Sequence, residues 1–316
     1  MAKIAFVFPG QGSQTVGMGM ELYQQFTSVK EYFDLADETL KFPLSEVIFQ
    51  GPKETLTLTT NAQPALLTTS IAILSRLKEH NIEADFVAGH SLGEYSALVA
   101  AGVITFEDAV AAVRKRGEYM EEAVPNGLGA MAACLGADRT KLEELTANIT
   151  NEGTQVQLAN INCPGQIVIS GSAAGVQKPI ERIKEIGAKR AIPLDVSGPF
   201  HSSLMQPASS KLQATFEQMK WEEAFIPVIS NVTAQPMVSR EEIKEKLIEQ
   251  LYSPVLWQDC VETMIEQGVD TFIEIGPGKV LSGLIKKINR NVRILSVSNE
   301  EEVQAVLAAL KEEPLV

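Results

Sequence analysis

The sequence predicts an α/β fold with a parallel sheet at its centre. Two observations support this: strand-like and helix-like segments alternate along the chain, and the strand-like segments are short and apolar without polar alternation. The expected strands are residues 4–8, 86–88, 227–230, 271–275 and 293–297. The expected helices include residues 63–80, 94–101, 106–122, 240–251 and 280–289.

The middle of the chain has a different pattern. Its segments read in order as a strand (129–135), a helix (138–149), two strands (155–162 and 166–170), a helix (174–186) and a strand (191–196). This βαββαβ order is the split, ferredoxin-like unit. We therefore expect a small domain, residues 127–197, inserted into a large α/β domain made of residues 1–126 and 198–316, with the functional site in the cleft between them.

Composition excludes several classes of protein. No run approaches the roughly 18 apolar residues of a membrane span, and the N-terminus lacks a signal-peptide pattern, so a cytoplasmic protein without a membrane partner is expected. A net charge of −13 argues against a nucleic-acid partner. The three cysteines lie far apart, which indicates neither a metal site nor a disulfide framework.

A GxSxG pentapeptide, Gly89-His90-Ser91-Leu92-Gly93, provides a candidate nucleophile. It follows the apolar residues 86–88 and precedes a helical segment, and strand, tight turn and helix together form a nucleophile elbow. The N-terminus of the helix would place free N–H groups beside Ser91 for an oxyanion. The simpler alternative is a strand-to-helix turn with a capping serine.

A serine hydroxyl needs a base, and only three histidines occur. His90 is next to Ser91, where neighbouring side chains diverge, and His80 lies among polar residues at a helix end. His201, in a loop that leaves the small domain, is the remaining candidate. Either Asp195 or a backbone carbonyl could orient its imidazole.

Two other segments carry candidate binding groups. The loop of residues 9–14 does not complete a dinucleotide-binding or phosphate-binding motif. We expect it instead to supply a second N–H donor beside Ser91. Arg114 and Arg116 lie about 200° apart on the helix 106–122, so one of them can point inward, although basic residues on helices are usually solvated. A buried arginine would need a carboxylate or a similar partner.

Three motifs in this order, Gln11-Gly12-Ser13-Gln14, Gly89-His90-Ser91-Leu92-Gly93-Glu94 and Gly198-Pro199-Phe200-His201, resemble those of malonyl-CoA:acyl carrier protein transacylases. The resemblance runs from about residue 4 to residue 297. It implies an α/β-hydrolase-like core with an inserted ferredoxin-like domain, which agrees with the segment order above.

The resemblance also implies roles for individual residues. Ser91 would be the acylated nucleophile and His201 its base and acid. Gln250 would orient His201 through its main-chain carbonyl, so that a change of its side chain should be mild. The oxyanion hole would be the N–H groups of Gln11 and Leu92. Arg116 would bind the malonyl carboxylate, and Asn160 and Asn162 would lie near the substrate.

The expected reaction is a two-step exchange. Malonyl-CoA would acylate Ser91, and the thiol of acyl carrier protein would then take the malonyl group for fatty acid elongation, with no metal or bound cofactor. Two alternatives stay open: a serine esterase or thioesterase, and a non-enzymatic acyl-binding module. For the acidic carrier protein, candidate docking residues are Lys189 with Arg190, and Lys286 and Lys287 with Arg290.

Overall fold

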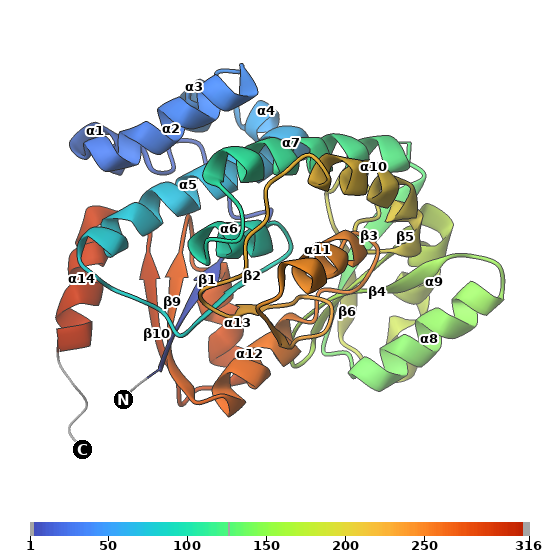
Figure 1. Cartoon of the computed structure of the whole chain (residues 1–316). Coiled ribbons are helices and arrows are strands. Elements are labelled where there is room, and N and C mark those ends of the chain that lie inside the picture. The colour runs from blue at the N-terminus through green and yellow to red at the C-terminus, as the bar shows by residue number, and fades with distance from the viewer. Residues whose placement is uncertain (1–2, 126, 312–316) are drawn as a thin grey trace.

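The computed structural model describes residues 3–125 and 127–311 (Figure 1). Its main sheet has six strands in the order β10 (Arg293–Val297), β9 (Val269–Ile275), β1 (Lys3–Phe8), β2 (Phe86–Gly89), β7 (Val228–Ile229) and β8 (Pro236–Met237). All neighbouring pairs are parallel except β7 with β8. The predicted α/β fold with a parallel-sheet core is therefore confirmed.

The central strand β1 shows why the strands lack polar alternation. Phe6 and Phe8 point into one hydrophobic cluster, and Ala5 and Val7 point into a second cluster on the other face. Because successive strand residues face opposite sides, both faces must be apolar when both are covered.

Helices cover the two faces of the main sheet (Figure 1). The first cluster includes residues of α2 (Thr27–Leu40), α5 (Thr59–Glu79), α6 (Leu92–Ala100), α7 (Phe106–Ala123) and α14 (Glu300–Lys311). The second includes residues of α12 (Trp257–Glu266) and α13 (Val280–Ile288). The remaining helices of the described large part are α1 (Met20–Gln25), α3 (Leu44–Gln50), α4 (Lys53–Thr57), α10 (Gln206–Phe216) and α11 (Arg240–Glu249). None of the helices of the described residues is long and apolar enough to cross a membrane.

Helix α5 begins at Thr59, four positions before the expected start, so that Pro64 lies inside it. Proline has no N–H, which leaves the carbonyl of Thr60, four residues earlier, without its helical partner. Arg114 on α7 donates to this carbonyl through Nη1 at 3.0 Å. A side chain from another helix thus compensates for the proline.

A second, antiparallel sheet has the strand order β4 (Val156–Cys163), β5 (Gln166–Ser172), β3 (Gly129–Leu135) and β6 (Arg190–Pro193). Helices α8 (Arg139–Asn151) and α9 (Ala173–Arg182) pack on it, and their apolar residues share a cluster with the strands. The last strand ends at Pro193 rather than at the expected residue 196: the Leu194 N–H still donates to the Met131 carbonyl of β3 at 2.9 Å, and residues 194–196 line a cavity. The segment order along the chain is the expected one.

The two sheets meet through β4. Asn160 forms a bridge with Val255 of the large part, and the N–H of Ile161 donates to the Val255 carbonyl at 2.9 Å. This contact places one end of β4 beside the carboxyl end of β2. It is there that the residues singled out from the sequence come together.

Candidate active site

Ser91 lies on the turn between β2 and α6. Its φ of 51° and ψ of −106° are strained for a residue with a side chain. The turn is possible because glycines flank it: a Cβ on Gly93 would lie 2.1 Å from the carbonyl oxygen of Phe8, and one on Gly89 would lie 1.8 Å from Gly93. Backbone therefore packs directly on backbone, and the serine hydroxyl is presented at the carboxyl end of the sheet.

The structure brings His201 to this hydroxyl. Its Nε2 lies 2.7 Å from Ser91 Oγ, and its Nδ1 lies 2.8 Å from the carbonyl oxygen of Gln250. A carbonyl only accepts, so Nδ1 carries the hydrogen and Nε2 is free to accept from the serine. Of the two candidates for orienting the imidazole, Asp195 and a backbone carbonyl, the carbonyl is the one that bonds Nδ1.

His201 is 4% exposed. Burial, and then the positive charge of Arg116, lower the pKa of His201 to about 3. The imidazole is therefore neutral at neutral pH, which is the form that can take a proton from Ser91.

The side chain of Gln250 is used as well as its main chain. The amide nitrogen Nε2 donates to the Ser91 carbonyl at 3.1 Å and to Glu94 Oε2 at 2.8 Å, and Oε1 accepts from Arg116 Nη2 at 3.0 Å. The side chain is fully buried. The Gln250 amide therefore also connects three residues of the site, and the expectation that a change of this side chain is mild stays a prediction.

Arg116 is the inward-pointing arginine of α7 and is 1% exposed. Its guanidinium donates to Ser91 Oγ at 3.1 Å, to Gln250 Oε1 and, through Nη1, to Gln63 Oε1 at 2.8 Å. Arg114 points away and bonds Thr60, Asn61 and Glu118 instead.

Gln11 and Leu92 line the same cavity as Ser91, His201 and Arg116, which has a volume of about 250 Å³. Within the described residues, neither main-chain N–H has a hydrogen-bond partner. The N–H of Ser91 itself is occupied, because it donates to Asn231 Oδ1 at 2.7 Å. Free amides on both sides of the serine are what an oxyanion would need.

Asn160 also lines this cavity, whereas Asn162 contacts it indirectly. Asn162 Oδ1 lies 2.9 Å from His90 Nε2, and the His90 ring packs on Trp257 with centroids 5.8 Å apart. His90 is thus a link between the elbow and the small sheet. Burial lowers its pKa.

Three residues that contact the site were not assigned a role from the sequence: Gln63, Glu94 and Asn231. Asn231 holds the elbow, because it accepts from the Ser91 N–H and donates through Nδ2 to the Gly89 carbonyl at 2.7 Å. Glu94 had one available signal, since a Glu three positions after a helix-capping Ser is the capping-box spacing. The two amides had none.

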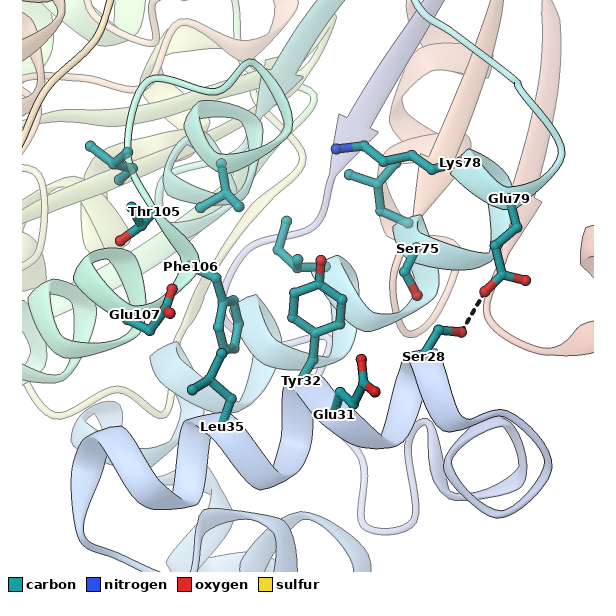
Figure 2. Close-up of a pocket in the computed structure, with 14 residues that line it drawn as sticks. Ser28, Glu31, Tyr32, Leu35, Ser75, Lys78, Glu79, Thr105, Phe106 and Glu107 are labelled. Atoms are coloured by element: carbon teal, nitrogen blue, oxygen red, sulfur yellow. Dashed lines mark hydrogen bonds between the residues drawn. The ribbon is translucent and has the colours of Figure 1, made fainter.

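A larger hollow lies elsewhere. It has a volume of about 770 Å³ and lies between α2, α5 and the start of α7 (Figure 2). Tyr32 and Phe106 meet edge to face in it, and Ser28 donates to Glu79 at its rim. It shares no lining residue with the cavity at Ser91, so it is separate from the candidate site.

The chain is similar in sequence and structure to known acyltransferases. A family model described as "Acyl transferase domain" matches residues 5–313. The chain is 61% identical to the malonyl CoA-acyl carrier protein transacylase of Bacillus subtilis over 99% of both chains, and 50% identical to that of Staphylococcus aureus over 96% of this chain and 98% of the relative.

Solved structures are similar over nearly their whole length. The acyl-carrier-protein-S-malonyltransferase of Bartonella henselae has a TM-score of 0.95 at 43% identity and covers 98% of this chain and 99% of its own. A malonyl-transacylase solved in complex with a type II PKS acyl-carrier protein has a TM-score of 0.94 at 41% identity, covering 98% of this chain and 100% of its own.

Proposed function

Since the chain belongs to the acyl transferase family, we propose that it transfers the malonyl group of malonyl-CoA to the phosphopantetheine thiol of acyl carrier protein. One observation supports this choice most directly: the cavity that contains Ser91 and His201 also contains a buried arginine. A site for a neutral acyl group has no need of that charge. The product supplies fatty acid chain elongation.

In the first half-reaction Ser91 Oγ attacks the thioester carbonyl while its proton passes to His201 Nε2. The N–H groups of Gln11 and Leu92 stabilise the negative oxygen of the tetrahedral intermediate. Collapse breaks the carbon–sulfur bond, and His201 returns the proton to the leaving CoA sulfur. The result is a malonyl-serine ester and free CoA.

In the second half-reaction the carrier-protein thiol gives its proton to His201 and attacks the ester carbonyl. The same two amides stabilise the second intermediate. The carbon–oxygen bond breaks, Ser91 recovers the proton from His201, and the malonyl group leaves on the carrier protein. The Gln250 carbonyl stabilises the imidazolium that forms in each step, because it accepts from Nδ1–H.

Arg116 binds the malonyl carboxylate. Its Nε–H has no partner within the described residues, so the guanidinium can still donate to a ligand. A planar guanidinium matches a carboxylate in charge and geometry, especially away from water. Asn160, which lines the cavity, is placed to contact the same acyl group.

We also propose a more detailed description of the fold. We infer that residues 127–197 are a ferredoxin-like insertion in an α/β-hydrolase-like domain, supported by the βαββαβ order and the antiparallel second sheet. The predicted boundary residue 126, and residues 1–2 and 312–316, lie outside the described residues. A cytoplasmic location is supported by the three cysteines, all of which are free thiols.

The esterase alternative required an acid beside His201. The main-chain carbonyl of Gln250 occupies that position instead. This arrangement suits a neutral base that exchanges a proton with two thiols, those of CoA and of the carrier protein. No specific observation favours the acyl-binding alternative over the enzyme.

The test is the intact mass of the protein after mixing with malonyl-CoA. We expect one malonyl adduct on the wild type, none on Ser91→Ala, and acylation slowed by about 10²–10⁴-fold in His201→Ala. A malonyl adduct that persists on folded Ser91→Ala would contradict the mechanism.

A further inference from the structure

Glu94 is a buried carboxylate directly below the nucleophile. It is 1% exposed, in the first turn of α6, three residues after Ser91. Its Oε2 accepts from the Gln250 amide at 2.8 Å and from the Asn231 N–H at 3.1 Å, while Oε1 has no partner within the described residues. The reaction described above gives this carboxylate no role.

Arg116 is a buried cation without an ion pair. In the described part of the chain no carboxylate lies within 4.0 Å of its guanidinium. Glu94 is the carboxylate whose charge acts on it. Buried charges are costly unless they are compensated, so Glu94 is the compensating charge of the free enzyme.

One amide joins the two charges. Gln250 presents Oε1 to Arg116 and Nε2 to Glu94, the orientation in which each end of the amide dipole faces the opposite charge. The main-chain carbonyl of the same residue orients His201. A change in the charge of Glu94 therefore acts on Arg116 through the side chain of Gln250.

We propose that Glu94 is an exchangeable counter-charge for Arg116: its ionised form compensates Arg116 in the free enzyme and takes up a proton from solvent when the malonyl carboxylate binds. This inference rests on the proposed function, because it requires a substrate carboxylate at Arg116. In this step the Glu94 carboxylate, one proton from solvent and malonyl-CoA combine to give a complex in which the Glu94 carboxyl group is neutral.

The physical reason is that one guanidinium cannot compensate two carboxylates in a dry site. Burial raises the pKa of Glu94 to about 7, while the bonds from Gln250 and Asn231 and the charge of Arg116 lower it. Once the substrate carboxylate pairs with Arg116, the contribution of Arg116 is cancelled and the pKa of Glu94 rises further.

Among the described residues, no other group near Glu94 supplies a compensating positive charge. Burial raises the pKa of Tyr95, next to it on α6, well above its ordinary value, and burial also raises the pKa of Cys260 on α12. The pKa values of His201 and His90 are lowered by burial, so both imidazoles are neutral at neutral pH. Protonation of Glu94 is the remaining way to balance the site.

The consequence is a pH dependence that belongs to malonyl-CoA alone. Malonyl-CoA binds the protonated form better, so its affinity falls as the pH rises above about 7, by at most roughly tenfold per pH unit. Acetyl-CoA has the same CoA part but no carboxylate, so its affinity should lack this dependence.

Calorimetry on Ser91→Ala tests the inference, because that variant stops at binding. Titration with malonyl-CoA in two buffers of different ionisation enthalpy gives the number of protons taken up. We expect up to about half a proton at pH 7 and up to about 0.9 of a proton at pH 8, each after subtraction of the value for acetyl-CoA.

Ser91→Ala with Glu94→Gln should take up none and should bind malonyl-CoA with equal affinity at pH 7 and 8. Ser91→Ala with Glu274→Gln is the matched control, because Glu274 is also buried but accepts from Leu281 and Ser282 at the start of α13. It should keep the uptake.

Two outcomes would overturn the inference: malonyl-CoA that binds without proton uptake at both pH values, and uptake that Glu94→Gln leaves unchanged. The comparison of malonyl-CoA with acetyl-CoA decides the matter even where Glu94→Gln does not fold. Failure of the proposed function is a different result, since wild type would then form no malonyl ester.

Discussion

We propose that Arg116 is the residue at which substrate choice is decided. It is buried, bonded to Gln63 and Gln250, and within 3.1 Å of the nucleophile. An acetyl group would leave the guanidinium without the anion that the site is built to receive. Selectivity therefore comes both from attraction to malonyl and from a penalty against acetyl.

Arg116→Ala should lower kcat/KM for malonyl-CoA by about 30- to 1000-fold, the worth of a partly desolvated charged pair, and retain or improve acetyl transfer. Arg116→Lys should give an intermediate value, because it keeps the charge and loses the planar fork. The measurement is kcat/KM for both substrates after a check of folding.

Arg114→Ala is the control for that series. Arg114 stacks on Phe42 and bonds the start of α5, so its loss should lower stability more than selectivity. If Arg116→Ala lowered both substrates equally, Arg116 would be a structural residue.

His201 should make the folded protein sensitive to acid. Its pKa is about 3 in the fold and near 6.5 in an unfolded chain, so below pH 6.5 the unfolded state binds a proton that the folded state refuses. Stability is then complete above pH 6.5 and falls as the pH decreases, by up to about 1.4 kcal/mol per unit. Urea unfolding of wild type and His201→Gln between pH 7 and 4.5 measures this difference, and parallel stability curves would contradict it.

At the scale of elements, the crossing of α6 over β1 is the contact that shapes the elbow. A Cβ at Gly93 would collide with the carbonyl of Phe8, and neither backbone can move without displacing Ser91. The elbow is thus held by the packing of a helix on a strand as well as by the hydrogen bonds of Asn231.

Gly93→Ala should destabilise the protein by about 1–3 kcal/mol or more, as overpacking does, and reduce acylation of Ser91 in whatever folds. Gly283→Ala is the matched control. It lies in α13 with no atom within 4 Å of an added Cβ, so it should be neutral or stabilising by up to about 1 kcal/mol. The midpoint of thermal unfolding of both variants gives the answer, and equal midpoints would refute the packing argument.

The elements also show what the sequence can and cannot predict. Strands β1, β2 and β9 and the elbow were predictable because an apolar run followed closely by a glycine is a local signal, whereas the two-residue strand β8 was not expected. Helix α12 had a signal that was overlooked, since Trp257, Cys260, Val261 and Met264 have helical spacing and are buried. The roles of Gln63 and Asn231 could not be predicted, because an amide side chain gives no local signal. Its contacts here depend on which elements pack together in the tertiary structure.

At the scale of the whole molecule, two basic segments far apart in sequence approach the same turn. Lys189 packs against Gly136, whose N–H donates to the Gly165 carbonyl, and Lys287 donates to Gln166 at 3.2 Å. The described part of the chain has no carboxylate within 4.0 Å of Lys189, Arg190, Lys286, Lys287 or Arg290. On a chain of net charge −13, we expect these basic residues to attract an acidic carrier protein locally.

Lys286→Glu with Lys287→Glu should raise the KM for carrier protein on the order of 3–10-fold and leave the KM for malonyl-CoA unchanged. The effect should shrink as salt is added, because the charges are exposed. Lys30→Glu, an exposed reversal on α2, should have no such effect. Equal changes for both substrates would show that the residues act on the fold rather than on docking.

The order of strands in the main sheet has a consequence for biosynthesis. Strand β1 lies between β2 and β9, so β1 is synthesised long before one of its two partners, which begins at residue 269. At about 5–20 residues per second, on the order of 10–40 s separate the emergence of Ser91 from that of β9. Throughout that interval the nascent chain has an unpaired apolar strand edge and lacks the complete sheet around its serine, so this edge is open to aggregation until β9 has been made.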